Sequence, residues 1–169
     1  IMHRPLQCLL LGVWILNLSA CGFALRGGDV ISSQFSSIQL ISQQPNSEFS
    51  RLLRRSLDVS DVAVELVDAI EPVTGQALLS ISDERVVSRP VTVNTRARAA
   101  QYEMRLSVEI ALGRGEQILI EPETLFVERT YFEDIQNISG NREEVEIIAA
   151  EMRRELVNQL MRRLQAAGS

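Results

Sequence analysis

The chain has 169 residues, of which 17 are arginine or lysine and 22 are acidic, and its formal net charge is −5 at pH 7. This length fits one domain with a modest core, and the acidic balance disfavours nucleic acid as a partner. Arginine supplies all 17 of the cationic side chains, because the sequence contains no lysine.

The first 21 residues are typical of a bacterial lipoprotein signal. A basic start leads into an apolar run that ends in Leu18-Ser19-Ala20-Cys21. Small residues before a cleavage point fit the narrow pocket of a signal peptidase, and the cysteine after them can carry lipid. We expect residues 1–20 to be cleaved, Cys21 to be acylated, and residues 21–36 to form a tether.

A single uncut transmembrane anchor is the alternative for this segment. The apolar run from Leu6 to Ala20 is shorter than the roughly 20 residues that a membrane span needs, and Gln7 and Asn17 interrupt it. The sequence therefore favours lipidation.

Removal of the signal also removes His3 and Cys8. The mature chain then has no histidine, no lysine and one cysteine, Cys21. These absences exclude Ser-His-Asp and Cys-His catalysis, Schiff-base chemistry, the usual zinc sites and an internal disulfide. We expect no enzymatic activity, no cofactor and no metal.

The first half of the mature chain predicts a strand and a helix. Ser37–Ile41 is a candidate strand, and Pro45 ends it because proline cannot donate to a ladder. Asn46 or Ser47 can cap a helix. Its apolar positions follow helical spacing: Phe49, Leu52, Leu53 and Leu57.

The middle of the chain predicts three strands. Residues 77–93 indicate an edge strand with a bulge or break at Pro90. Residues 102–112 alternate strictly between apolar and polar side chains, which is typical of a sheet with one buried face. After a reversal at residues 113–115, residues 117–130 return as a partner strand, with Pro122 at a kink or an unpaired position.

A long helix over Asn141–Ala166 closes the chain, with Asn141 and Glu144 as a capping pair. It has one apolar stripe: Val145, Ile148, Ala149, Met152, Leu156, Leu160 and Leu164.

These elements predict one α/β domain over residues 37–169. We expect a two-layer sandwich in which two amphipathic helices cover one face of a four-stranded, mixed β-sheet. The opposite face would be polar, because it carries Glu103, Arg105 and Glu109.

Four motifs resemble the LptE family of lipopolysaccharide-assembly lipoproteins, and together they span the mature chain. They are Cys21-Gly22-Phe23-x-Leu25-Arg26-Gly27, Gln101-Tyr102-Glu103-Met104, Phe126-x-x-Arg129-x-x-Phe132 and the closing helix from Glu151-Met152 to Leu164. The resemblance implies two helices against a four-stranded sheet and no cofactor.

The resemblance also implies a function. Members of the family plug the outer-membrane β-barrel LptD, assist its assembly and bind lipopolysaccharide. The protein would then lie at the outer membrane, anchored by acyl chains and facing the periplasm and the barrel lumen. Gly22 is not the aspartate associated with inner-membrane retention, which agrees with this location.

The candidate lipopolysaccharide-binding residues are Arg96, Arg98 and Arg142. Arginine binds phosphate through a planar fork of N–H donors, and the resemblance implies basic residues in these two connections. The family's basic positions fall on Thr95 and Asn141, one residue earlier. Either the connections are shifted by one residue, or this chain uses a different set of contacts.

Two other functions stay open. One is a different periplasmic binding lipoprotein, such as a transporter-auxiliary or peptidoglycan-associated subunit. The other is a carboxylate-dependent glycan hydrolase, but Glu103 and Glu109 lie about 20 Å apart on one strand, too far to act as a pair.

Overall fold

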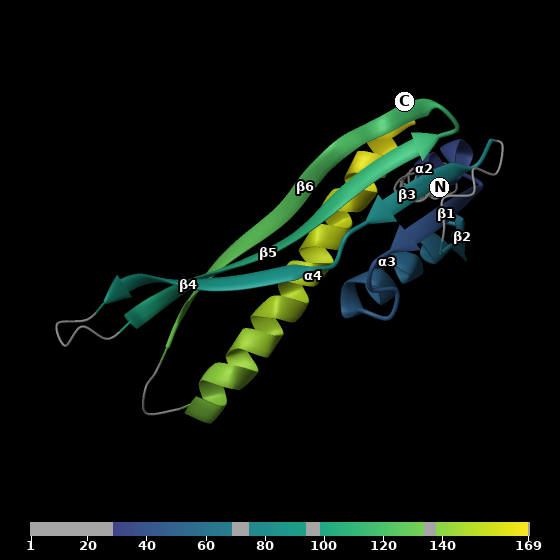
Figure 1. Cartoon of the computed structure of the whole chain (residues 1–169). Coiled ribbons are helices and arrows are strands. Elements are labelled where there is room, and N and C mark those ends of the chain that lie inside the picture. Colours follow the sequence, from purple (N-terminus) through teal and green to yellow (C-terminus); the bar gives the residue numbers. More distant parts are fainter. Residues whose placement is uncertain (1–28, 69–74, 94–98, 134–137, 169) are drawn as a thin grey trace, which may run out of the picture.

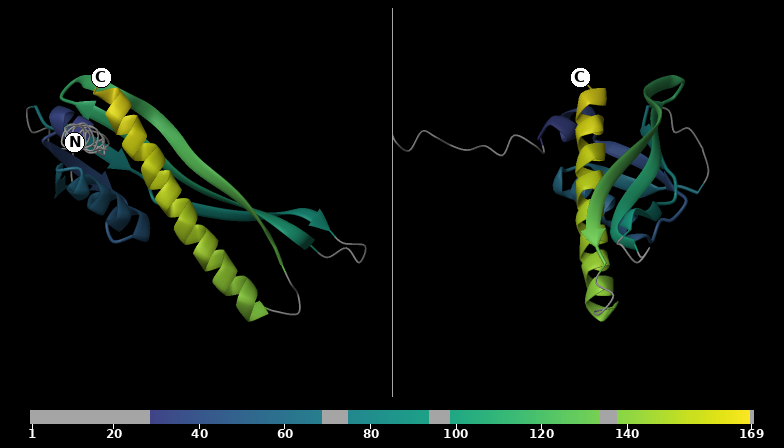
Figure 2. Two further views of the ribbon diagram at one scale, coloured as in Figure 1. Left: turned by 180° about the vertical axis from the view of Figure 1, so that it is seen from behind. Right: turned by 90° about the vertical axis from the view of Figure 1, so that its left-hand side faces the viewer.

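The computed structural model describes residues 29–68, 75–93, 99–133 and 138–168. Helices lie on one face of a single curled sheet, so the predicted two-layer α/β arrangement is confirmed (Figures 1 and 2). In chain order the elements are α2 (Asp29–Gln34), β1 (Ser37–Ser42), α3 (Glu48–Val59), β2 (Ala63–Leu66), β3 (Ala77–Ile81), β4 (Arg85–Val93), β5 (Ala99–Arg114), β6 (Gln117–Phe132) and α4 (Ile138–Ala167).

The sheet has six strands, so the prediction of four was wrong. Its order is β2-β1-β3-β5-β4, and β6 pairs with β5 along the other edge. Strand β1 pairs in parallel with β2 and β3, whereas β5 pairs antiparallel with β3, β4 and β6. The sheet is therefore mixed, as predicted.

Residues 77–93 form two strands rather than one interrupted edge strand. Strand β3 is internal, between β1 and the end of β5, while β4 pairs with the first half of β5. The pairing of β4 shifts register after Pro90, as expected where a proline leaves a donor missing. The prediction of an edge strand with an irregularity is thus confirmed for β4. It was wrong for β3, which lies inside the sheet and pairs regularly.

The β5–β6 hairpin contains the segment whose pattern was clearest in the sequence. The side chains of β5 that face the helices are buried, and the turn uses Gly115 at a φ of 60°, where glycine has no steric penalty. The β5–β6 ladder shifts register between Ile120 and Glu123, and Pro122 lies in this unpaired stretch of β6. The buried residues of β5 are Met104, Leu106, Val108, Ile110 and Leu112.

Both long helices begin close to the predicted positions. Ser47 caps α3, and its side chain accepts a hydrogen bond of 3.1 Å from the backbone of Ser50. Helix α4 begins at Ile138, so Asn141 and Glu144 lie inside the helix and the predicted capping pair was wrong. The apolar stripe of α4 becomes fully buried toward its C-terminal half: Met152, Leu156, Val157, Leu160 and Leu164.

Part of the predicted tether is packed on the domain. Ile31 of α2 and Phe35 just after it are buried in the core. The Arg114 guanidinium lies 5.1 Å above the ring of Phe35 and donates a hydrogen bond to the carbonyl oxygen of Gln34. The folded part of the chain therefore begins before residue 37.

The elements divide the molecule into two regions along its length (Figure 1). We call the region of α2, α3, β1, β2, β3 and the β5–β6 turn the body. The arm is β4 with residues 99–107 of β5 and 124–132 of β6. Helix α4 runs along both regions, as the reverse view in Figure 2 shows.

Candidate binding surface at the end of the arm

Of the residues predicted for lipid attachment and lipopolysaccharide binding, one is among the described residues and three are not. Cys21, Arg96 and Arg98 are outside the part of the chain that the structure describes. Arg142 is exposed in the first two turns of α4.

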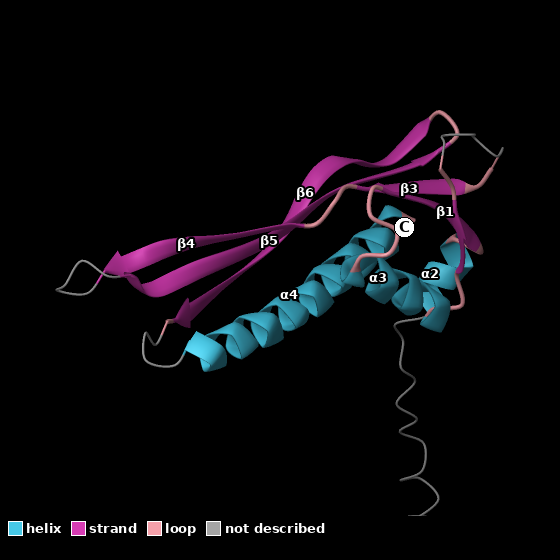
Figure 3. Cartoon of the chain, turned by 60° about the horizontal axis from the view of Figure 1, so that its bottom comes forward, coloured by secondary structure: helices cyan, strands magenta, loops and turns pink. Residues whose placement is uncertain are grey.

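The described ends of β4, β5 and β6 and the start of α4 lie at the same end of the molecule. Val93 pairs with Ala99 where β4 and β5 end, and Gln101 of β5 pairs with Phe132 at the end of β6. Helix α4 begins at Ile138, also away from the body (Figure 3). Arg142 and the described residues on either side of the gap at residues 94–98 therefore lie toward this end of the molecule.

Two tyrosines stack beside these connections. Tyr102 and Tyr131 are directly opposed on β5 and β6, with ring centroids 5.4 Å apart and ring planes 13° from parallel. The Tyr102 hydroxyl donates a hydrogen bond to the Glu133 carboxylate, which raises the pKa of Tyr102 above its ordinary value. Partial burial and the charge of Glu133 act in the same direction. The two rings thus pack against each other across the β5–β6 ladder.

Charged side chains on the helix-free face of the arm pair with one another. Arg89 contacts Glu103 at 2.6 Å, and Arg105 contacts Glu128 at 2.7 Å. Each pair joins residues directly opposite in the ladder, and Arg105 also lies 4.4 Å from the ring centre of Phe126. This face is polar, as predicted, and cross-strand pairing accounts for its charges.

A further ion pair joins the arm to α4. Arg129 of β6 contacts the carboxylate of Glu155 on the helix. Arg129 was one of the positions that carried the family resemblance, and here it links the two layers. Because both partners are substantially exposed, the pair contributes little to the stability of the fold.

The body has an apolar groove on its helix-free face, which sequence reasoning missed. The groove has a volume of about 280 Å³ and is lined mainly by the sheet. Prediction of a wholly polar face was therefore wrong at this end. Ile118-Leu119-Ile120 is apolar on both faces of β6, and this was the available signal. The apolar lining includes Ile41, Leu78, Ala111, Ile118, Ile120 and Pro122.

The described residues contain no group of three or more histidine, cysteine, aspartate or glutamate side chains placed to hold a metal ion. Among the described helices, none is long and apolar enough to cross a membrane. At the end of the arm, the described residues with exposed charge include Glu133 and Arg142.

Comparison with solved structures defines the class of protein to which this fold belongs. Rare lipoprotein B from Shewanella oneidensis superposes with a TM-score of 0.66 at 21% identity, covering 77% of this chain and 94% of that one. A lipoprotein B from Nitrosomonas europaea gives 0.62 at 20% identity, with coverage of 86% and 91%. This chain thus shares its α/β fold with two bacterial proteins whose structures are solved.

Sequence comparison then identifies the family. The model of the family described as "LptE: Lipopolysaccharide-assembly" matches residues 35–164. The LPS-assembly lipoprotein LptE of Pectobacterium atrosepticum is 30% identical, over 96% of this chain and 86% of the relative. That of Photorhabdus laumondii is 27% identical, over 96% and 87%. The chain belongs to the LptE family, which confirms the resemblance seen in its motifs.

Proposed function

We propose that this protein is an outer-membrane lipoprotein that plugs the LptD β-barrel, assists its assembly and binds lipopolysaccharide on its way to the cell surface. The match of the LptE family model to residues 35–164 is the observation that carries the proposal. Relatives named LPS-assembly lipoprotein LptE align over nearly the whole chain, which supports the same function for the whole domain.

The proposed anchor is a set of acyl chains on Cys21. Two membrane signals anchor a protein stably, whereas one acyl chain binds only marginally. The described domain begins eight residues after Cys21, at Asp29. The anchor would therefore hold the body close to the membrane surface. Mass spectrometry of the purified protein should find an acylated Cys21 as its first residue.

The dimensions of the domain support a role as a plug. Helix α4 has 30 residues, a length of about 45 Å, and the strands of the β5–β6 hairpin have 16 residues each, about 50 Å. A bilayer has a hydrocarbon core of about 30 Å. A domain of this length, inserted lengthwise, would fill the full membrane-spanning height of a barrel.

The helix-free face of the sheet offers a surface for such a partner. Ile118 and Phe132 of β6 are 67% and 68% exposed, and Phe126 is 46% exposed. By their pairing with Gly113, Gln101 and Ser107, all three lie on this face. We propose these three side chains, together with the apolar groove beside Ile118, as the surface that contacts the barrel.

Lipopolysaccharide would bind at the end of the arm through Arg96, Arg98 and Arg142. Guanidinium groups bind phosphate in a bidentate manner. Val93 and Ala99, where β4 and β5 end, and the start of α4 lie at one end of the molecule, which supports a shared site there. Several arginines there could contact one polyanionic headgroup together.

Charge reversal of these arginines tests the proposed site. The double variant Arg96→Glu with Arg98→Glu, and separately Arg142→Glu, should bind purified lipopolysaccharide at least several-fold more weakly at low salt. The difference should shrink as salt screens the interaction. Fluorescence or surface binding titrations at two salt concentrations would measure it.

Arg162→Glu is the matched control. Arg162 is an exposed arginine on the same helix as Arg142 but near its opposite end. Its reversal changes the net charge of the protein by two units, as Arg142→Glu does and half as much as the double variant does, and it should leave binding unchanged. An equal loss in the control, or unchanged binding in the arm variants at low salt, would remove these arginines from the site.

A further inference from the structure

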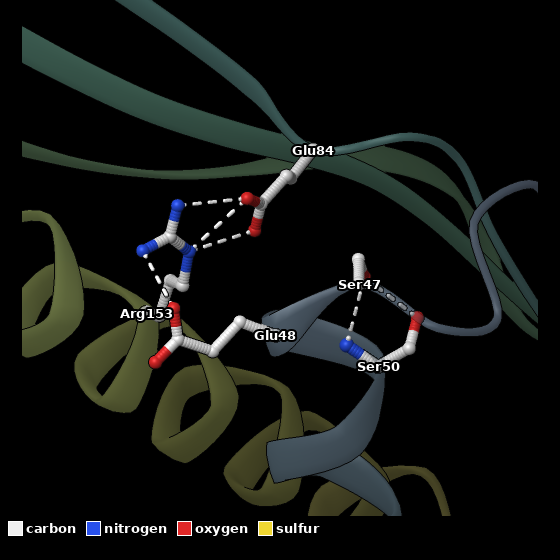
Figure 4. A network of polar contacts seen from close by, with 5 residues as sticks. All are labelled: Ser47, Glu48, Ser50, Glu84 and Arg153. Atoms are coloured by element: carbon white, nitrogen blue, oxygen red, sulfur yellow. Dashed lines mark hydrogen bonds and ion pairs between the residues drawn. The ribbon is translucent and has the colours of Figure 1, made fainter.

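Arg153 forms the most enclosed ion-pair cluster among the described residues (Figure 4). Its Nε lies 3.0 and 3.1 Å from the two carboxylate oxygens of Glu84, and its Nη2 lies 2.9 Å from Oε1. Its Nη1 donates to Glu48 at 3.1 Å. The side chains of Arg153 and Glu84 are only 17% and 14% exposed. This bidentate geometry is that of a strong charge-assisted contact.

The cluster joins three elements that are far apart in the sequence. Arg153 lies in the middle of α4, Glu48 is the first residue of α3, and Glu84 lies in the short connection from β3 to β4. Body and arm meet at this connection. The contact therefore ties the boundary between the two regions to both long helices.

The sheet is irregular at the same level. On one side of β5, pairing with β3 ends at Ile81 and Ile110, and pairing with β4 begins at Arg85 and Ser107. On the other side, the ladder with β6 shifts register between Ile110 and Leu112. Strand β5 therefore has two adjacent irregularities: residues 108–109 pair with β6 only, and residue 111 pairs with β3 only. Irregular pairing of this kind bends and twists a strand.

A few backbone contacts hold the connection itself. Ser82 donates from its backbone to the carbonyl oxygen of Glu109 at 3.0 Å, and the Ser82 hydroxyl accepts from the Glu109 backbone at 3.0 Å. The amide of Asp83 donates to the side chain of Gln43 at 3.3 Å. These bonds hold Ser82 and Asp83, and none of them involves Glu84.

We propose that the Arg153, Glu84 and Glu48 cluster is a positioning device that fixes the direction of the arm relative to the body. Arg153 holds Glu84, the last residue before β4, against α4 and the start of α3. Without this contact, the bent sheet at residues 108–112 of β5 would let the arm change direction. The consequence for function rests on the proposed role of the arm in binding lipopolysaccharide, whereas the geometric claim does not.

Energetic comparison among the ion pairs supports this assignment. By comparison, Arg163 of α4 pairs with Glu123 of β6, and the two side chains are 56% and 34% exposed. This pair makes a single contact. Exposed pairs contribute little, whereas loss of one partner from an enclosed pair leaves a desolvated charge. The hydrogen bond with Glu84 also raises the pKa of Arg153, so its charge is permanent.

Distance measurement between two spin labels tests the device. Val59 at the end of α3 is 78% exposed and Val91 on β4 is 52% exposed, so cysteine at each can carry a label without disturbing the core. The full lipoprotein in detergent would be compared with its Arg153→Met and Glu84→Gln variants. We expect a narrow distance distribution in the parent and a broader or shifted one in both variants.

Arg163→Met is the control, because it removes an arginine from the same helix without touching the connection. Its distribution should match that of the parent. Hydrogen exchange supplies the second readout: amides of β4 should exchange about tenfold faster in Glu84→Gln, while those of α3 stay unchanged. Because Glu84→Gln is nearly isosteric, it remains informative if Arg153→Met does not fold.

Three results would overturn the proposal. One is an unchanged distance distribution in Glu84→Gln. Another is an equal change in the Arg163→Met control. The third is faster exchange by the same factor throughout the domain, which would mean that the cluster stabilises the whole fold without directing the arm.

Discussion

At the end of the arm, the ionisation of the Tyr102 hydroxyl can be followed by titration. Its hydroxyl donates to Glu133, and this hydrogen bond raises its pKa above the ordinary 10.0. The neutral tyrosine is favoured in the folded state. The resulting stabilisation is fully present below pH 10 and is lost as the pH rises through the raised pKa.

We predict that Tyr102 ionises at a higher pH than an isolated tyrosine and that Glu133→Gln returns its pKa toward 10.0. A neutral amide accepts the hydrogen bond less strongly and has no charge to oppose the phenolate. Absorbance titration in a Tyr131→Phe background would follow Tyr102 alone. If Glu133→Gln leaves the pKa of Tyr102 unchanged, Glu133 does not contact this hydroxyl.

Single residues show how far sequence patterns reach. The cap at Ser47 could be predicted because serine before an apolar helical pattern has one strong local explanation. Asn141 has the same capping chemistry, yet it lies inside α4, which begins three residues earlier. The local sequence pattern therefore predicts that this helix exists, but it does not predict the residue at which the helix begins.

Helix α4 is the element that closes the core along the length of the sheet. Leu156 is fully buried in its C-terminal half, whereas Ile147, one residue from the apolar stripe, is 55% exposed. Both are large aliphatic residues in the same helix. They therefore separate the contribution of packing from that of helix propensity.

We predict that Leu156→Ala lowers the free energy of unfolding by about 2–5 kcal/mol, while Ile147→Ala changes it by less than about 0.5 kcal/mol. Loss of apolar burial and the cavity left behind account for the difference. Urea denaturation monitored by circular dichroism would measure both variants. Similar losses in the two variants would mean that α4 does not pack against the sheet through this stripe.

Elements with strong periodicity could be predicted, and elements defined by their neighbours could not. Strand β5 alternates so strictly that its buried face follows from the sequence. Strand β2 has four residues, most of them exposed, so it has no pattern to detect. The separation of β3 from β4 depends on which part of β5 each one pairs with, which is a property of the topology.

Helix α2 is a different case, because a signal was present. Ile31 and Phe35 are four residues apart and both are buried. That spacing is typical of an amphipathic helix. The surrounding glycine and serine residues obscured it and favoured a tether.

At the scale of the whole molecule, the parts with functional interest arise from tertiary arrangement. The apolar groove is formed by residues of β1, β3, β5 and β6, so no single segment predicts it. The Arg153 cluster likewise joins residues up to 105 positions apart. By contrast, Arg96, Arg98 and Arg142 could be proposed as candidates from the sequence, because the family motifs on either side of them are local patterns.

The central claim is that this member of the LptE family acts with an outer-membrane barrel. Affinity purification of the tagged lipoprotein from detergent-solubilised outer membranes, followed by mass spectrometry, tests it most directly. We expect to recover an LptD-type β-barrel in equal amount with the lipoprotein. Recovery only as a free monomer, or with an inner-membrane transporter or a cell-wall component, would contradict it.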